Sequence, residues 1–257
     1  MQGVFNMLRR APYRADHVGS LLRPPAIHEA RKHCFSGSVG SDRFGTSDQL
    51  REVEDIAIAE VVKMQESIGL LAATDGEYRR WFWHFDFMGA LSGMELVERS
   101  EGVQFHGIQI PPIHPTITER INFPDNHPML DHFRYLVSVT NVQPKMSIPG
   151  PSCCHFRIAK ADIAPPEYAD VEVLFSDLTK TYSKAVKEFY KAGCRYLQMD
   201  DIFFAYLCDP NQREKKKAEG LDPDWLITQY AKMMHDAIED RPEDMVIAMH
   251  LCRGNFR

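Results

Sequence analysis

The sequence has no apolar run long enough to cross a lipid bilayer, a span that takes about 20 consecutive residues. Its start also lacks the order of a secretory signal, because Arg9 and Arg10 follow the first apolar residues instead of preceding them. Six cysteines are scattered through 257 residues, a chain too large to need disulfide bonds for its stability. We therefore expect reduced thiols and a cytoplasmic protein.

The chain also lacks an excess of positive charge. Its formal net charge is −6, which argues against a general nucleic-acid binder and against a protein of anionic membrane surfaces. The basic triplet Lys215-Lys216-Lys217 lies between Glu214 and Glu219, which is typical of a solvated face. We expect small-molecule partners, and a homo-oligomer is compatible with the sequence.

Neither of the glycine-rich phosphate-binding motifs, G-x-G-x-x-G and G-x-x-x-x-G-K-[ST], follows any predicted strand. What the chain does have is an alternation of short β-like runs and long helical patterns. The pattern predicts strands over residues 14–20, 70–74, 144–148, 195–199 and 245–251, and helices over residues 47–67, 168–192 and 223–239. Strands separated by helices imply right-handed crossovers and a parallel sheet.

We therefore expect one α/β domain over residues 1–257, a (β/α)8 TIM barrel in which about five of the eight strands are present. Residues 95–123 interrupt the alternation with polar–apolar patterning and three prolines, which predicts a hairpin-like insertion.

Polar side chains stand where the predicted strands end, at Ser20, Glu77, Asp200 and His250. The carboxyl ends of barrel strands form the active face of such folds. His250 and Cys252 fall on the same side of the last strand, where an imidazole and a thiolate make half of a tetrahedral zinc site. The alternative to a zinc site is that a buried His and a buried Cys fall at this spacing by chance.

Five motifs stand at strand ends in order. They are Asp16-His17-Val18-Gly19-Ser20, Asp75-Gly76-Glu77-Tyr78-Arg79-Arg80, Ile148-Pro149-Gly150-Pro151, Leu197-Gln198-Met199-Asp200-Asp201 and His250-Leu251-Cys252-Arg253-Gly254-Asn255. Together they resemble the catalytic barrel of cobalamin-independent methionine synthase, and most closely its short single-barrel relatives. The resemblance runs from about Tyr13 to Arg257.

The resemblance implies transfer of a methyl group from a methylated reduced folate to the thiol of homocysteine, giving methionine. It also implies zinc bound by His250 and Cys252, together with a later Glu and Cys that would follow Arg257. On this resemblance the barrel is truncated at its C-terminus and inactive alone. Glu77 and Asp200 are implied to face the substrate ammonium, and the turn at Gly19 and Ser20 its carboxylate.

The chain departs from the family pattern at three places. Arg253-Gly254-Asn255 replaces a Cys-Tyr-Cys-like continuation, Asp201 replaces a Glu, and Phe156 is the aromatic residue nearest to the position of a family tryptophan. The thiol half of the chemistry therefore carries over better than the identity of the methyl donor. The alternatives are an alkyl–thiol transferase with another acceptor, a member of the metal-free uroporphyrinogen decarboxylase group, and an inactive barrel fragment stabilised by a partner chain.

Several candidate residues keep a purely structural alternative. Glu77 could pair with Arg79 or Arg80, and Ser20, Asp200 and Asp201 could each be a helix cap. His17 could be a core residue or a cofactor contact. A dense aromatic cluster could stack a pterin or plug the barrel mouth; its members are Trp81, Phe82, Trp83, Phe85 and Phe87.

Overall fold

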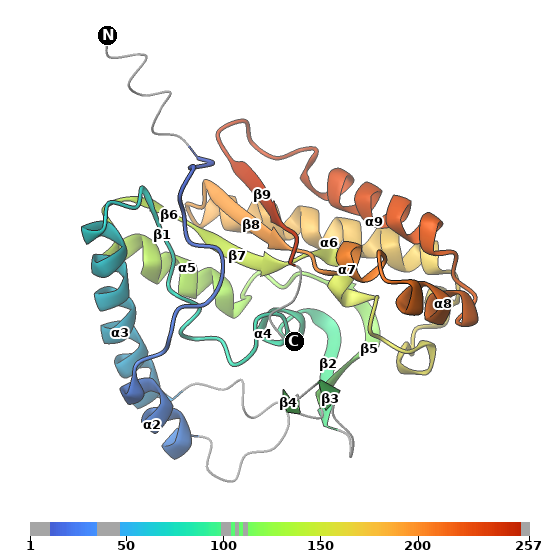
Figure 1. The fold of residues 1–257 in the computed structure, drawn as a ribbon, viewed down its shortest axis with the longest axis horizontal. Coiled ribbons are helices and arrows are strands. Elements are labelled where there is room, and N and C mark those ends of the chain that lie inside the picture. Colours follow the sequence, from blue (N-terminus) through green and yellow to red (C-terminus); the bar gives the residue numbers. More distant parts are fainter. Residues whose placement is uncertain (1–10, 35–46, 99–103, 106–107, 110–112, 253–257) are drawn as a thin grey trace.

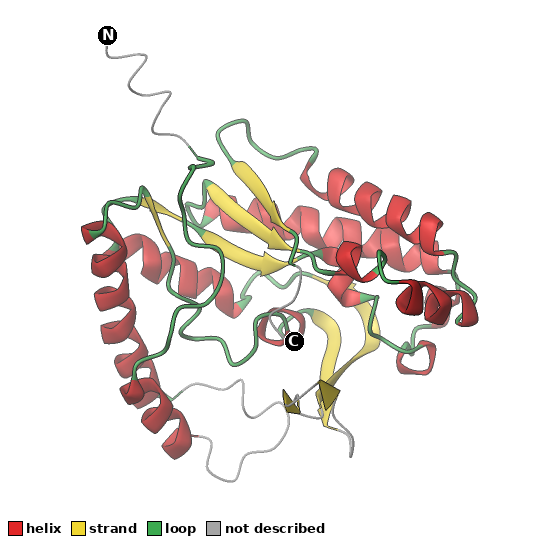
Figure 2. Cartoon of the chain, in the orientation of Figure 1, coloured by secondary structure: helices red, strands yellow, loops and turns green. Residues whose placement is uncertain are grey.

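The computed structural model describes residues 11–34, 47–98, 104–105, 108–109 and 113–252, which form a mixed helix and sheet fold (Figures 1 and 2). The helices are α2 (Pro25–Cys34), α3 (Asp48–Ser67), α4 (Phe85–Met88), α5 (Pro128–Val139), α6 (Val171–Lys191), α7 (Phe203–Tyr206), α8 (Pro210–Ala218) and α9 (Pro223–Ile238). The strands are β1 (Ala72–Ala73), β2 (Ser92–Glu98), β3 (Gln104–Phe105), β4 (Ile108–Gln109), β5 (Ile113–Asn122), β6 (Gln143–Pro144), β7 (Met146–Pro149), β8 (Tyr196–Asp200) and β9 (Val246–His250). None of the helices in these ranges is long and apolar enough to cross a bilayer.

Parallel strands form the centre of the fold. Strands β7, β8 and β9 lie side by side in that order, and β1 pairs with β6. Only Lys145 separates β6 from β7, and its amide donates to the carbonyl of Ala73 at 2.9 Å. The parallel pairings therefore continue from β1 through β6 and β7 to β8 and β9. Within the described ranges the strands do not close into a barrel.

The two faces of this sheet differ in chemistry because successive side chains of a strand point to opposite sides. Met146, Ile148, Leu197 and Met199 are at most 1% exposed and belong to the main hydrophobic core. That core also contains the inner side chains of α5, α6 and α9, which cover this face (Figure 1). The opposite face carries the buried polar residues Lys145, Ser147, Gln198 and Asp200.

The segment of residues 13–24 runs over the polar face, where side chains of the sheet bond residues 16–18. Lys145 Nζ donates to Asp16 Oδ1 at 3.1 Å and to the carbonyl of His17 at 2.7 Å. Gln198 Nε2 donates to the carbonyl of Val18 at 2.8 Å. The strand predicted over residues 14–20 was wrong, because side chains of the sheet, and not a neighbouring strand, bond this backbone.

The three long predicted helices are present as α3, α6 and α9. Ser47 caps α3 by accepting from the amide of Leu50 at 3.1 Å, and Gly69 follows the helix with φ of 86°. Gly193 follows α6 in the same left-handed region, with φ of 100°. Glycine adopts this conformation without a Cβ clash, so both helices end where the sequence indicates.

Strands β2 and β5 form an antiparallel pair within the segment where the sequence predicts a hairpin-like insertion. Residues 99–103, 106–107 and 110–112 of that segment lie outside the described ranges. A bridge from Ile117 to Ile163 connects β5 to the loop before α6.

Candidate functional site

Three neighbouring strands end in one row. Pro149, Asp200 and His250 are register partners on β7, β8 and β9, and each is the last residue of its strand. Because the register places Asp200 beside His250, both side chains stand on the polar face of the sheet. The imidazole of His250 is close enough to the carboxyl group of Asp200 to work towards lowering its pKa.

Glu77 reaches this row from the turn after β1. Gly76 and Glu77 both have left-handed backbones, with φ of 65° and 58°. For a residue with a Cβ this conformation is uncommon and costs free energy, so the surrounding contacts must hold it. Asp75 Oδ1 accepts from the Glu77 amide at 2.9 Å, and Arg23 Nη2 donates to the Glu77 carbonyl at 2.7 Å.

The Glu77 side chain is fixed through one of its two oxygens. Ser147 Oγ donates to Glu77 Oε1 at 3.0 Å, and Arg80 Nη1 lies 3.3 Å from the same oxygen. Arg80 also donates to the Ser147 carbonyl and hydroxyl. The ion pair expected as a structural alternative therefore exists with Arg80, but it is buried.

The charge of Arg80 is maintained by its neighbours. Burial works to lower the pKa of the Arg80 guanidinium, but the carboxylates of Glu77, Asp75 and Asp200 outweigh it and raise that pKa. Arg79, the adjacent arginine, instead pairs with Glu54 and Asp55 away from the row.

Asp200 is also held through one oxygen. Gln198 Nε2 donates to Asp200 Oδ1 at 2.6 Å. Burial raises the pKa of the Asp200 carboxyl to about 6, against the opposing effects of Gln198 and Arg80, and the charge of Glu77 adds to the rise. Among the described residues nothing donates to Glu77 Oε2 or Asp200 Oδ2. Two carboxylates near one another thus each keep an oxygen for a ligand.

Asp201 holds the turn that leads into the short helix α7, although the N-cap residue of that helix is Ile202 and not Asp201. Its Oδ1 accepts from Ser152 Oγ at 2.5 Å and from the Phe203 amide at 3.1 Å. Its Oδ2 is buried without a partner among the described residues. A Cβ on Gly150 would lie 2.5 Å from that oxygen, so glycine is required there.

The other predicted candidates are Ser20, Cys252 and His17. Ser20 is exposed, but the amide of the next residue, Leu21, donates to the Gly76 carbonyl at 3.0 Å beside the Glu77 turn. Cys252 is half-buried two residues beyond the end of β9, and residues 253–257, with the predicted Arg253-Gly254-Asn255 departure, lie outside the described ranges. His17 is half-buried, and its Nε2 has no partner among the described residues.

Imidazole and thiolate donors suit zinc, so His250 and Cys252 fit the chemistry of that metal. A catalytic zinc usually takes three protein ligands, and this pair supplies two. The one three-ligand group in the described part of the chain is His235, Asp236 and Glu239 at the C-terminal end of α9, away from the row of strand ends. The described residues therefore supply two ligands of a zinc site and would need at least one more.

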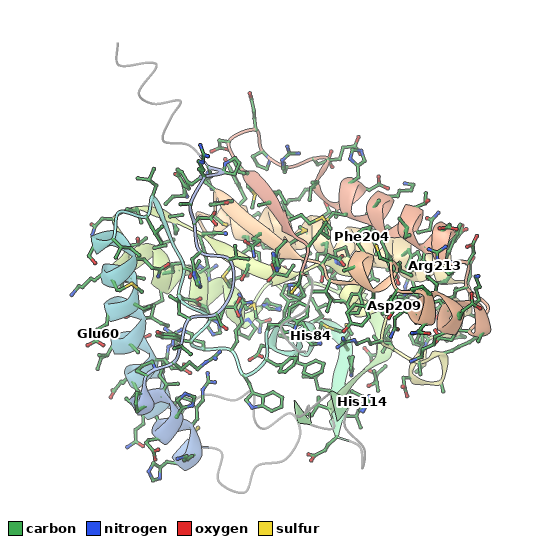
Figure 3. All side chains as sticks on the ribbon, in the orientation of Figure 1. Glu60, His84, His114, Phe204, Asp209 and Arg213 are labelled. Carbon is green, nitrogen blue, oxygen red and sulfur yellow. The ribbon has the colours of Figure 1, made fainter. Side chains whose placement is uncertain are left out.

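A cavity of about 560 Å³, which was not predicted as a whole, is lined in part by the segments that follow β7 and β8, but not by Glu77, Asp200 or His250. Phe82 and Phe85 line it, in agreement with the predicted aromatic cluster, whereas Phe87 lies in the main core. The remaining wall comes from β5 and the segments after β7 and β8. Figure 3 labels His84 beside α4 and His114 on β5, and labels Phe204, Asp209 and Arg213 on the segment that follows β8.

Cationic side chains line the same cavity. Arg157 donates to the Tyr206 hydroxyl at 2.5 Å and lies 5.4 Å from the centre of the Phe203 ring, with no acidic partner in the described part of the chain. Lys216 is buried and donates to the Phe156 carbonyl and to Glu219, both at 2.7 Å. Burial lowers the pKa of His84 well below its usual range, so that ring is neutral. The lysine triplet predicted as solvated thus contributes Lys216 to a cavity wall.

Sequence and structure comparisons place the chain among known proteins. Protein YxjH of Bacillus subtilis, which is uncharacterized, is 42% identical over 250 residues, and the match covers 97% of this chain and 64% of YxjH. The chain thus spans less than two thirds of that relative. The methionine synthase of Sulfolobus acidocaldarius is 25% identical over 248 residues, covering 93% of this chain and 61% of that protein. No family model matches the sequence.

A solved structure gives the strongest evidence of kinship. It is a candidate vitamin-B12-independent methionine synthase of Listeria monocytogenes, 38% identical to this chain, with a TM-score of 0.75. The match covers 96% of this chain and 67% of the Listeria protein. With the five ordered strand-end motifs, this similarity shows that the chain belongs to the short cobalamin-independent methionine synthase-like family.

Proposed function

We propose that the protein is a methyltransferase that moves a methyl group from a methylated reduced folate to the thiol of homocysteine, giving methionine. The observation that carries the proposal is the pair of carboxylates on the polar face, Glu77 and Asp200, each with one oxygen left for a ligand. The methionine synthase names of its relatives support the reaction class.

The acceptor end of the site follows from charge. Two carboxylates share Arg80 as their buried counter-ion, so the pair keeps an excess negative charge that suits one ammonium group. With a pKa of about 6, Asp200 is mostly ionised at neutral pH and above. Ser20 and the backbone of Gly19 would hold the substrate carboxylate, as the family resemblance implies.

The thiol end would lie towards His250 and Cys252. Zinc held by these residues and by further ligands would deprotonate the acceptor thiol. Because Asp200 and His250 are register partners, an amino acid bound through its ammonium at Asp200 has its side chain beside the proposed metal.

The cavity lined by Phe82, Phe156 and Arg157 would take the methyl donor. Its aromatic walls suit a flat ring system, and Arg157 without an acidic partner suits an anionic group. Because segments that follow β7 and β8 line the cavity, a donor bound there would lie towards the ends of those strands, where the acceptor thiol would bind.

The test is methionine formation from homocysteine and a methylated reduced folate, followed by mass spectrometry, with a polypeptide that carries the further zinc ligands that the family resemblance implies after Arg257. We expect Glu77→Gln to raise the KM for homocysteine at least tenfold, and Arg157→Gln to raise the KM for the folate without changing that for homocysteine. Glu54→Gln, which breaks a buried pair away from the row, is the control for general loss of folding. Equal use of an amine-free thiol would instead favour the alkyl–thiol transferase alternative.

A further inference from the structure

Gln198 connects Asp200 to the segment that crosses the polar face. Its side chain is 3% exposed, and its single amide nitrogen donates both to Asp200 Oδ1 at 2.6 Å and to the Val18 carbonyl at 2.8 Å. The nitrogen carries two protons, so both are used. Turning the amide over would place its oxygen against two acceptors, so the hydrogen bonds allow one orientation.

The far end of this connection is itself fixed. The residues on either side of Val18 belong to the segment of residues 13–24, which Lys145 holds through Asp16 and the His17 carbonyl. The Tyr196 hydroxyl donates to Asp16 Oδ2 at 2.5 Å from the first residue of β8. The two residues before Val18 are therefore held by the sheet, and the Val18 carbonyl next to them accepts from the Gln198 nitrogen.

The register adds a second donor beside the first. Ser147 and Gln198 are partners on β7 and β8, and Ser147 holds Glu77 as Gln198 holds Asp200. Adjacent side chains on one face of the sheet thus hydrogen-bond both carboxylates. In each carboxylate, this hydrogen bond uses one oxygen and leaves the other available.

We propose that Gln198 is a positioning residue that sets the selectivity of the site for amine-bearing ligands. By occupying Asp200 Oδ1, it turns Oδ2 towards the ammonium, and Val18 O holds it in that position. The inference rests on the proposed function, because it takes the ammonium as the ligand of Asp200.

The experiment measures dissociation constants by calorimetry for two probes. One is L-methionine, the product of the proposed reaction, and the other is 4-(methylthio)butanoate, which is methionine without its amine. For Gln198→Met, similar in length but without donors, we expect about tenfold weaker binding of methionine and less than a twofold change for the amine-free probe. Gln198→Asn, too short to span both acceptors, should give the same selective loss and covers the case in which Gln198→Met does not fold.

Gln65→Met is the matched control. Gln65 is also a buried glutamine, at 1% exposure, and its nitrogen also donates twice, to the carbonyls of Val61 and Thr74. Its loss should lower the melting temperature and leave the ratio of the two dissociation constants as in the wild type. An equal change of that ratio in both glutamine variants, or equal weakening of both probes in Gln198→Met, would overturn the proposal.

The same measurements distinguish an error in the proposed ammonium site from an error in the role of Gln198. If wild-type protein binds both probes equally, the ammonium site of the proposed function is wrong and Gln198 has nothing to position. If wild type prefers methionine and Asp200→Asn abolishes the preference while Gln198→Met retains it, only the positioning role is wrong.

Discussion

Asp200 and His250 are register partners at the ends of adjacent parallel strands, so a carboxylate and an imidazole face the same space from neighbouring backbones. The Asp201 amide strengthens this junction by donating to the His250 carbonyl at 3.0 Å. Strand pairing, and not loop geometry, therefore sets the distance between Asp200 and His250. Sites carried on strands are held more rigidly than sites on loops.

Replacing Gly150 by alanine should destabilise the protein. The new Cβ would stand 2.5 Å from the buried Oδ2 of Asp201, a side chain that is held through its other oxygen by Ser152 Oγ and the Phe203 amide. Overpacking of this kind costs about 1–3 kcal/mol. Urea unfolding measures the loss, and Gly19→Ala, with no atom within 4 Å of its new Cβ, is the control. Equal stabilities of the two variants would refute the predicted clash.

Acid should weaken the fold through His155. Burial, with a smaller effect of Lys216, lowers the pKa of this histidine to about 3, and its Nδ1 lies 2.7 Å from the Tyr230 hydroxyl. The folded state thus favours the neutral ring, so its contribution is present above the unfolded pKa near 6.5 and is lost as the pH falls from there towards 3.

The expected slope is at most about 1.4 kcal/mol per pH unit for this one group. His155→Gln should therefore lose less unfolding free energy than wild type between pH 7 and pH 4.5, measured by urea titration at both values. His235→Gln, which replaces an exposed histidine on α9, should follow wild type. A wild-type slope in His155→Gln would show that this ring is not held neutral.

Zinc content should depend more on Cys252 than on His250. Thiolate is the charged and softer ligand, so its loss removes more binding free energy than loss of an imidazole. Elemental analysis and competition with a chelator should show weaker zinc binding in Cys252→Ser than in His250→Asn, and no change in Cys208→Ser, an exposed thiol on another segment. Unchanged zinc affinity in Cys252→Ser would place the metal elsewhere.

Local signals predicted the helices well, because Ser47 and the glycines at 69 and 193 act within a few residues of the helix ends. The strand predicted at residues 14–20 failed for a long-range reason. Its backbone acceptors are taken by Lys145 and Gln198, more than 100 positions away, and no local pattern reports such contacts.

The pattern of an apolar run followed by a polar residue is visible in a single sequence, and it marked Glu77, Asp200 and His250 as candidates at strand ends. It could not assign Gln198, Ser147 or Arg80, whose roles depend on register and on which side chains meet across the sheet. It likewise missed Arg157 and Lys216 in the cavity wall, because their neighbours come from distant segments.

The most direct test of the account is the preference for an amine-bearing ligand in two neighbouring aspartate variants. Dissociation constants for L-methionine and 4-(methylthio)butanoate are measured for wild type, Asp200→Asn and Asp201→Asn. Asp200 has an oxygen without a donor among the described residues, whereas Asp201 accepts from Ser152 Oγ and the Phe203 amide. Asp200→Asn should therefore lose at least tenfold of the preference for methionine, and Asp201→Asn should keep the wild-type ratio. The account is contradicted if Asp200→Asn keeps the preference of wild type or if Asp201→Asn loses it equally.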